Sequence, residues 1–333
     1  MGPTGAGKTA CALALAREFP LEIVSVDSAL VYRGLDIGTA KPDPVQQRAV
    51  PHHLLDICEP TDPYSAARFR QDALTVIAGI RARQRVPLLV GGTGLYFRAL
   101  QQGLTVLPAA DPVLRRELAA TFAGPGAQAM HQRLQQVDPP SAARIHPNDP
   151  QRVLRALEVF MLTGRAMSEL LAGTPSVAAP FAVLNWVIAP RERSTLHARL
   201  ATRFQAMLER GLINEVMGLR ARPALSADTP AMRAVGYRAV WQYLAGELTF
   251  EHMVEAAVSA TRQLAKRQYT WFRAVTDATW WDSEDGSLVT SLSQSLAEHL
   301  RLARSESANV DYTQAAGARS ASGPGPLLPV RAP

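Results

Sequence analysis

The sequence predicts an α/β fold in which a parallel sheet is flanked by helices and carries an all-helical insertion domain. Short apolar runs at residues 23–27 and 86–90 alternate with helical stretches at 10–19 and about 64–85. This alternation of strand and helix is typical of a parallel sheet. From about Leu104 the pattern changes to helix after helix without a strand, which predicts the insertion.

The helical stretch contains recognisable start and stop signals. Three acidic residues stand directly before a proline, in the pairs Asp111-Pro112, Asp138-Pro139 and Asp149-Pro150. Each pair offers a capping carboxylate followed by a residue suited to the first helical position. Gly164 suits the C-terminal end of the helix that contains residues 152–162. We therefore expect helices that begin at each pair.

After the insertion the chain is expected to return to the core fold. Residues 181–188 are predicted to form a strand, and residues 192–210 and 251–273 to form long basic helices. Beyond Leu302 periodicity is lost, which is typical of a disordered tail. The predicted organisation is core at 1–103, helical insertion at 104–180, core at 181–302, and tail at 303–333.

Composition indicates a globular protein outside membranes. The 333 residues are 47% hydrophobic, enough to fill a core, and the net charge of +6 is compatible with a polyanionic partner. No segment approaches the ~18 apolar residues of a membrane span, and the N-terminus does not resemble a secretory signal. We expect a cytoplasmic monomer, in which Cys11 and Cys58 are structural.

A phosphate-binding loop opens the sequence. The run Gly2-Pro3-Thr4-Gly5-Ala6-Gly7-Lys8-Thr9 fits the pattern G-x-x-x-x-G-K-[ST] and leads directly into a helical stretch. In such a loop, backbone N–H groups and the helix N-terminus hold phosphate oxygens. Lys8 would contact the outer phosphate, and Thr9 would be a ligand of Mg²⁺. The pattern predicts a P-loop NTPase-like sheet with Mg²⁺ as cofactor.

The segment before the loop departs from this pattern. A phosphate loop normally follows a buried strand, and here only Met1 precedes it. Loss of a central strand would leave ladder hydrogen bonds and apolar faces of its neighbours uncovered. We therefore expect the natural start codon to lie upstream of Met1.

Asp27 is the candidate catalytic carboxylate. It ends the predicted strand at 23–27, at the edge where ligands bind in open α/β sheets, whereas the strand at 86–90 ends in glycines. Three roles are open on position alone. Asp27 can act as a general base toward an acceptor, hold Mg²⁺ through water, or cap the turn at Ser28-Ala29.

The segment from Asp27 to Pro42, with the sequence DSALVYRGLDIGTAKP, closely resembles the signature of the tRNA dimethylallyltransferase (isopentenyltransferase) family. The similarity continues through residues 52–57, 64–66, 91–96, 151–158, 233–238 and 263–273. It therefore spans nearly all of the chain except the tail and the strand expected before the loop.

The resemblance implies transfer of a dimethylallyl group from dimethylallyl diphosphate to N6 of the adenosine 3′-adjacent to the anticodon of tRNA, with Mg²⁺ assisting. The partners would be the tRNA anticodon stem-loop and the diphosphate donor. Asp27 matches the family's general base, Arg203 matches a diphosphate contact, and Thr9 completes the catalytic set. The residues implied to contact tRNA are Asp27, Ser28, Ala29, Leu30, Thr93, Arg115, Gln151, Arg152, Val153, Leu154, Arg155, Arg233, Ala234, Val235, Gly236, Tyr237, Arg238, Lys266, Arg267, Gln268, Tyr269, Thr270, Trp271, Phe272 and Arg273.

These residue types also suit the chemistry. An adenine exocyclic amine is a poor nucleophile and must lose a proton as it attacks. Asp27 can accept that proton, while Lys8, Thr9 with Mg²⁺ and Arg203 stabilise charge on the leaving diphosphate. ATP hydrolysis is not required.

The second predicted basic helix, at residues 251–273, has its basic and apolar residues on opposite sides. At 100° per residue, one 60° sector holds Arg262, Lys266, Tyr269 and Arg273, and the opposite side holds Met253, Ala257, Ala260, Leu264 and Trp271. This predicts a basic stripe with one aromatic ring, suited to RNA, or alternatively an ordinary solvated face.

Two other aromatic pairs have less specific predictions. Adjacent histidines such as His52 and His53 point to opposite faces of a strand, so a structural role is favoured over a metal site. Trp280 and Trp281 are predicted to lie in the core or in a late strand, with nucleic-acid contact as the alternative.

Other functions remain open at this point. One is a prenyltransferase that acts on free adenine nucleotides, which would not need residues 151–155 or the basic stripe. Another is a small-molecule kinase. The third is an inactive RNA-binding module, since the strand before the loop is missing.

Overall fold

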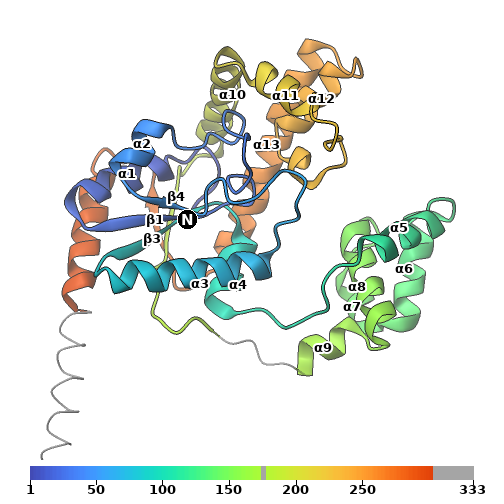
Figure 1. The fold of residues 1–333 in the computed structure, drawn as a ribbon. Coiled ribbons are helices and arrows are strands. Elements are labelled where there is room, and N and C mark those ends of the chain that lie inside the picture. The colour runs from blue at the N-terminus through green and yellow to red at the C-terminus, as the bar shows by residue number, and fades with distance from the viewer. Residues whose placement is uncertain (174–177, 303–333) are drawn as a thin grey trace, which may run out of the picture. The chain divides into compact units, whose positions relative to one another are not determined.

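The structure is a computed structural model that describes residues 1–173 and 178–302 (Figure 1). The predicted tail at 303–333 lies outside the described residues. The chain forms two compact units. Among the described residues, the core unit comprises Met1–Tyr64, Thr75–Thr93 and 184–302, and the helical unit comprises Ser65–Leu74, 94–173 and 178–183. The helical unit thus starts at Gly94, where the sequence predicts residue 104, and includes a short earlier segment.

A three-stranded parallel sheet lies in the core unit and confirms the predicted fold class. Its order is β2-β1-β3, formed by His52–His53, Leu21–Val26 and Val86–Gly91. All six residues of β1 are buried, as expected for a central parallel strand. In the register, Ile23 is opposite His52 on one side and Leu88 on the other.

A second parallel pair is formed by β4 (Trp186–Ala189) and β5 (Thr279–Asp282). The strand predicted at 181–188 is therefore shorter than expected. Its residue pairing begins where Trp186 is opposite Thr279, the first residue of β5. Asn185, just before the strand, accepts the Thr279 N–H through its carbonyl oxygen at 2.9 Å. The two tryptophans 280 and 281 lie in β5, which confirms the late strand.

The segment before the phosphate loop also runs along β4. The Met1 ammonium donates to Trp186 O at 2.7 Å, and Ile188 N donates to Met1 O at 3.0 Å. Gly2 follows in close contact, because a Cβ built on it would lie 2.2 Å from Ile188 O. The start of the loop is therefore fixed to β4 by backbone contacts.

Helices complete the core unit around several apolar clusters. They are α1 (Lys8–Glu18), α2 (Pro44–Ala49), the C-terminal part of α3 (Ala66–Ala82), α10 (Arg193–Glu209), α11 (Leu212–Arg220), η1 (Pro230–Arg233), α12 (Tyr237–Leu244) and α13 (Phe250–Arg273). Ala12 of α1 packs on Ile23 of β1 and on Val50. In a larger cluster, Val31 and Leu35 of the segment after β1 pack among residues of α10 to α13. This segment is therefore held by apolar burial.

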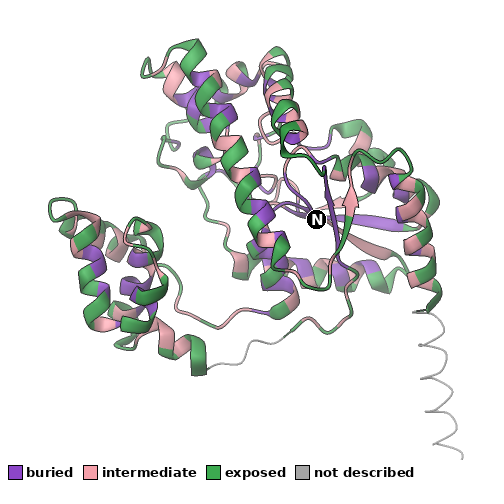
Figure 2. Cartoon of the chain, turned by 180° about the vertical axis from the view of Figure 1, so that it is seen from behind, coloured by how far each residue is buried: buried purple, intermediate pink, exposed green. Residues whose placement is uncertain are grey.

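The helical unit contains α4 (Gly94–Gln102), α5 (Pro112–Thr121), α6 (Gly126–Val137), α7 (Pro139–Arg144), α8 (Pro150–Thr163) and α9 (Met167–Gly173). Buried residues line the inner faces of its helices, and exposed residues lie outside (Figure 2). The predicted caps are confirmed. Asp111, Asp138 and Asp149 each accept backbone N–H groups at the start of a helix, and Gly164 ends α8 with φ 66°.

Membrane insertion has no support in this part of the chain. None of the helices in residues 1–173 and 178–302 is both long enough and apolar enough to cross a bilayer.

The loop at residues 36–38 is fixed by one carboxylate. Glu215 of α11 accepts the backbone N–H groups of Asp36, Ile37 and Gly38, and it accepts the Tyr237 hydroxyl at 2.5 Å. Burial, together with the nearby Glu215 charge, raises the pKa of Tyr237 well above its usual range. Tyr237 therefore stays protonated and remains the donor.

Gly38→Ala should destabilise the core unit, because a Cβ at this position would lie 2.5 Å from Tyr237 Cε2. We expect a loss of about 1–3 kcal/mol in the free energy of unfolding, measured in urea, as for other overpacked sites. Gly286→Ala is the matched control, since no atom lies within 4 Å of its added Cβ. Equal effects of the two substitutions would contradict the role of this contact.

Candidate active site

The phosphate loop forms one wall of a pocket in the core unit. Gly5 and Gly7 both have φ 79°, in the left-handed region that favours glycine. Gly7 is the N-cap of α1 and supplies no side-chain cap, so the first-turn N–H groups of α1 remain available to an anion. The loop therefore has the backbone form that phosphate binding requires.

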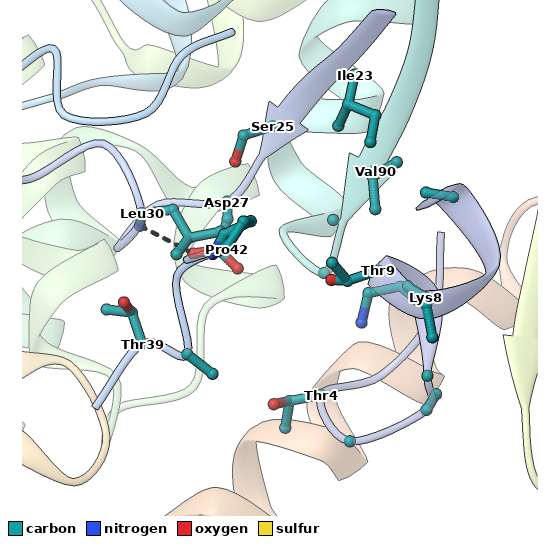
Figure 3. A pocket seen from close by; sticks show the side chains of 18 of the residues that line it. Thr4, Lys8, Thr9, Ile23, Ser25, Asp27, Leu30, Thr39, Pro42 and Val90 are labelled. Atoms are coloured by element: carbon teal, nitrogen blue, oxygen red, sulfur yellow. Dashed lines mark hydrogen bonds between the residues drawn. The ribbon is translucent and has the colours of Figure 1, made fainter. Parts of the chain in front are cut away.

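The pocket encloses about 190 Å³. Its lining combines the phosphate loop with the end of β1, the segment at residues 39–42 and two helices (Figure 3). Figure 3 shows Lys8 and Thr9 on one side and Asp27 on the other. The lining residues are Thr4 to Ala10, Ala12, Ile23, Ser25, Asp27, Leu30, Thr39, Ala40, Pro42, His52, Leu55, Val90 to Gly92, Arg203 and Gln268.

Lys8 and Arg203 supply the positive charge of the pocket. Burial lowers the pKa of Lys8 to about 8, with Asp27 acting in the opposite direction and Arg203 lowering it further. Lys8 Nζ donates to Pro3 O at 2.7 Å. Burial also lowers the pKa of Arg203. Two desolvated cations thus lie with a single carboxylate, so the pocket favours an anionic ligand.

Asp27 uses one oxygen for structure. Its Oδ1 accepts N–H of Ala29 at 2.8 Å and N–H of Leu30 at 3.4 Å, so the turn-capping role is present. Its Oδ2 makes no hydrogen bond to the described residues. Thr93 Oγ1 accepts N–H of Ser28 at 3.1 Å and connects the same turn to the end of β3. The carboxylate is therefore oriented while one oxygen stays available for a proton or for metal-bound water.

Gln268 of α13 connects the phosphate loop to β3. Its Oε1 accepts Thr4 N–H at 2.8 Å and its Nε2 donates to Gly92 O at 2.9 Å. The side chain is only 8% exposed. The sequence predicts an RNA contact for Gln268, whereas the structure places it in the wall of the pocket. Sequence spacing cannot reveal this role, because Thr4 and Gln268 are 264 residues apart.

The helical-wheel prediction for α13 is partly wrong. Tyr269 is buried instead of exposed on the basic stripe, and its hydroxyl donates to Pro190 O at 3.2 Å. Its ring stacks on Trp280, with centroids 6.3 Å apart. The buried face of α13 is centred nearer to Ala265 and Phe272 than the wheel assumes. The basic residues on the exposed surface of α13 are Arg262, Lys266, Arg267 and Arg273.

Other predicted RNA contacts are also buried. Val153, Gly236, Tyr237 and Phe272 all lie in the protein interior, where they pack or support the backbone. The side chains of Val153, Tyr237 and Phe272 cannot be direct RNA contacts in this conformation. The flanking residues are at least partly exposed: Ser28, Gln151, Arg152, Arg233, Arg238 and Thr270 are exposed, and Ala29, Leu30, Thr93, Leu154, Arg155, Ala234, Val235 and Trp271 are half-buried.

Two predicted arginines meet on one carboxylate in the helical unit. Arg115 donates to both oxygens of the fully buried Glu158, at 2.9 and 3.0 Å, and Arg155 donates to it at 2.5 Å. Burial opposes ionisation of Glu158, but these hydrogen bonds outweigh it and lower its pKa. The arginines are therefore held in fixed positions by a charge that sequence reasoning did not identify.

The two adjacent histidines have different surroundings. His53 pairs with Glu22 at 2.7 Å, whereas His52 lines the pocket. In residues 1–173 and 178–302 no group of three His, Cys, Asp or Glu side chains is arranged to hold a metal ion. Gly2 and Pro3, which the sequence predicts to bind diphosphate, are not among the residues that line the pocket.

Sequence reasoning also missed Ser25, Thr39, Pro42 and His52 as lining residues. Alternation along β1 offers a signal for one of them. Ile23, Ser25 and Asp27 are two residues apart in sequence, so their side chains leave the same face of the chain. If the Asp27 carboxylate faces the pocket, the Ser25 side chain is therefore expected to face it as well.

Gln268→Leu should lower stability, because Thr4 N–H and Gly92 O would lose their partner. Leaving a buried polar group unpaired costs about 1–3 kcal/mol, so we expect a decrease of that size in the free energy of unfolding in urea. The control is Gln263→Leu on the exposed face of the same helix. If both variants unfold at the same urea concentration as the unsubstituted protein, the bridge is not a structural constraint.

Comparisons with known proteins agree with this geometry. A family model described as IPP transferase matches residues 30–275. The chain is 54% identical over 283 residues to the tRNA dimethylallyltransferase of Methylococcus capsulatus, covering 85% of this chain and 91% of that protein. It is 57% identical over 274 residues to the enzyme of the same name from Thioalkalivibrio sulfidiphilus, covering 82% and 86%.

Solved structures are similar over most of the chain. The tRNA isopentenylpyrophosphate transferase of Bacillus halodurans gives a TM-score of 0.67 at 36% identity, covering 93% of this chain and 97% of that one. A eukaryotic dimethylallyltransferase acting on tRNA gives a TM-score of 0.72 at 27% identity, covering 86% and 73%. The family model covers well over half of the chain, and the relatives exceed half identity, so the chain belongs to the IPP transferase family.

Proposed function

We propose that this protein transfers a dimethylallyl group from dimethylallyl diphosphate to N6 of the adenosine 3′-adjacent to the anticodon of a tRNA. The observation that carries the proposal is the single pocket in which the phosphate loop, two cations and the available oxygen of Asp27 lie together. Relatives named tRNA dimethylallyltransferase support the same reaction.

The reaction forms two bonds, N6–C1 and Oδ2–H of Asp27, and breaks two, C1–O and N6–H. The N6 lone pair attacks C1 of the dimethylallyl group, the C1–O bond breaks, and its electron pair leaves with the diphosphate. The N6 proton passes to Asp27 Oδ2. The Lys8 and Arg203 cations and the loop N–H groups stabilise the charge on the leaving diphosphate. Asp27 is suited to its role because its Oδ1 is already fixed by the turn.

Mg²⁺ is proposed as the cofactor. The hydroxyl of Thr9 and, through water, the carboxylate of Asp27 are hard oxygen ligands, and Mg²⁺ sites commonly combine one or two protein oxygens with substrate phosphates. When bound, the ion would neutralise charge on the diphosphate. The residues present fit this group, since Thr9 follows the phosphate-contacting Lys8 and opens to the pocket.

The basic side chains on α13 are proposed to contact tRNA phosphates. Arg262, Lys266, Arg267 and Arg273 are all exposed on this one helix. Each phosphate neutralised by such a group adds affinity that decreases with salt. A free adenine nucleotide is too small to gain affinity from all four of these basic side chains. The exposed basic surface of α13 therefore favours a macromolecular acceptor.

Asp27→Asn should reduce prenyl transfer by at least about 100-fold, because general-base catalysis is typically worth 10²–10⁴. The measurement is the mass gain of an anticodon stem-loop RNA incubated with dimethylallyl diphosphate. Binding of this RNA should change little, since asparagine retains the Oδ1 that accepts Ala29 N–H. Asp43→Asn is the matched control, because Asp43 also caps a turn but lies outside the pocket lining.

Each outcome of this experiment has a distinct meaning. Transfer by Asp27→Asn at the rate of the unsubstituted protein would exclude Asp27 as the base. Loss of RNA binding would make Asp27 a recognition residue. A mass gain on AMP alone would favour the free-nucleotide enzyme, and no gain on either acceptor would refute both prenyltransferase functions.

Binding of inorganic diphosphate should weaken as the pH rises through about 8, where Lys8 loses its proton. The lowered pKa means that Lys8 is fully charged only below this range. Lys8→Arg is the control, because arginine keeps its charge, and the difference in pH profile between the two proteins isolates the contribution of Lys8. Calorimetric titrations from pH 6.5 to 9.5 provide the measurement, and identical profiles would contradict the assignment.

A further inference from the structure

Two polar atoms at the inner end of the pocket have no hydrogen-bond partner among the described residues. They are the hydroxyl oxygen of Ser25 and Nε2 of His52. Both residues line the pocket, and Ser25 is only 4% exposed. Buried polar atoms in proteins are nearly always paired, so this pair indicates a ligand group that is polar at the same position.

The two residues share one face of the sheet. Ile23 is paired in register with His52, and Ser25 lies two residues further along the same strand. Ile23, Ser25, His52 and Val90 all line the pocket, whereas His53 pairs with Glu22. Ser25 also precedes Asp27 by two residues, which corresponds to roughly 6.6 Å along a strand. The polar pair therefore lies deeper than the carboxylate.

The protonation of His52 can be assigned from its partner. His52 Nδ1 lies 2.7 Å from Val50 O, and a carbonyl oxygen can only accept, so Nδ1 carries the hydrogen. Burial lowers the pKa of His52, which keeps the ring neutral near pH 7. Nε2 is then an acceptor, while the Ser25 hydroxyl can donate. An alcohol satisfies both atoms, because it donates to a nitrogen and accepts from a hydroxyl.

Apolar side chains line the same pocket as this polar pair. They belong to Ala12, Ile23, Leu30, Pro42, Leu55 and Val90. Such a lining accommodates a short hydrocarbon chain. In the proposed reaction, the tRNA acceptor reaches the sheet edge at Asp27, and Lys8 holds the diphosphate of the donor. The deeper part of the pocket then remains for the hydrocarbon tail of the donor.

We propose that the pocket accepts, besides dimethylallyl diphosphate, a five-carbon prenyl diphosphate with a hydroxyl at the far end of its chain. Ser25 and His52 bind that hydroxyl, and a water molecule takes its place when the unsubstituted chain is bound. This inference rests on the proposed function and defines its donor class. Ser25 and His52 are specificity residues in it, since neither takes part in the bond changes at C1.

The test is a competition between the two donors. The holoenzyme with Mg²⁺ receives an anticodon stem-loop RNA and an equimolar mixture of dimethylallyl diphosphate and its 4-hydroxy derivative. The two RNA products differ by 16 Da, so mass spectrometry gives the ratio of the two kcat/KM values directly. We expect the hydroxylated donor to be used within about tenfold of the other by the unsubstituted protein.

Substitutions then assign the effect to the polar pair. Ser25→Ala and His52→Phe should each lower the ratio of hydroxylated to unsubstituted product by about tenfold. Thr39→Val is the matched control, because its hydroxyl also borders the pocket but already donates to Leu35 O. It should leave the ratio unchanged, whatever its effect on rate.

The outcomes separate this inference from the proposed function. Transfer of dimethylallyl alone, with the hydroxylated donor disfavoured more than 100-fold by the unsubstituted protein, overturns the inference and leaves the proposed function intact. A ratio unaffected by Ser25→Ala and His52→Phe also overturns it. Transfer from neither donor refutes the proposed function itself. The comparison on the unsubstituted protein remains decisive if a variant does not fold.

Discussion

The hydrogen bonds of Gln268 fix the geometry on which the rest of the site depends. Through this one carboxamide, α13 is connected to the phosphate loop at Thr4 and to the end of β3 at Gly92. Gly92 has no side chain because a Cβ there would lie 2.2 Å from Gln268 Nε2. The position of the loop amides and the position of the β3 terminus are therefore not independent. They are set by a helix that belongs, in sequence, to the far end of the chain.

A consequence is that the charged groups of the pocket are partly withdrawn from water before any ligand binds. Lys8 and Arg203 both have lowered pKa values because of burial, and Asp27 alone opposes them. Such an arrangement disfavours the free protein electrostatically, and the diphosphate of the proposed reaction would relieve it. The loop N–H groups, Lys8 and Arg203 are already oriented in the folded protein. In the proposed reaction they therefore need little reorganisation as negative charge grows on the leaving diphosphate.

Signals within a few residues of one another were sufficient to predict much of the fold. The phosphate loop, the strand before Asp27 and the caps at Asp111, Asp138 and Asp149 all depend on neighbouring residues, and the structure has each of them. The strand itself ends at Val26, one residue before Asp27. The boundaries that depended on tertiary partners were less accurate. The strand at β4 is shorter than its apolar run because pairing with β5 begins only at Trp186.

The same distinction applies to the site. Tyr269 was placed on the wrong side of α13 because a helical wheel centres the buried face on apolar residues, whereas the actual face includes the polar Gln268. Glu158 pairs with Arg155 three residues earlier on α8, a spacing that the sequence shows. Its pairing with Arg115, and the position of His52 beside the pocket, depend on contacts between distant segments. No periodicity within one helix or strand encodes such contacts.

Asp27 explains how a phosphate loop can serve a transferase without ATP hydrolysis. In a hydrolase the neighbouring carboxylate positions Mg²⁺ and water, and the phosphorus atom is attacked. Here the carboxylate ends the strand that follows α1, with Oδ1 engaged by Ala29 and Leu30 and Oδ2 available in the pocket. In the proposed reaction, a base in that position serves an acceptor above the diphosphate, and the electrophile is the carbon attached to the diphosphate. The same loop would then stabilise a departing group instead of one under attack.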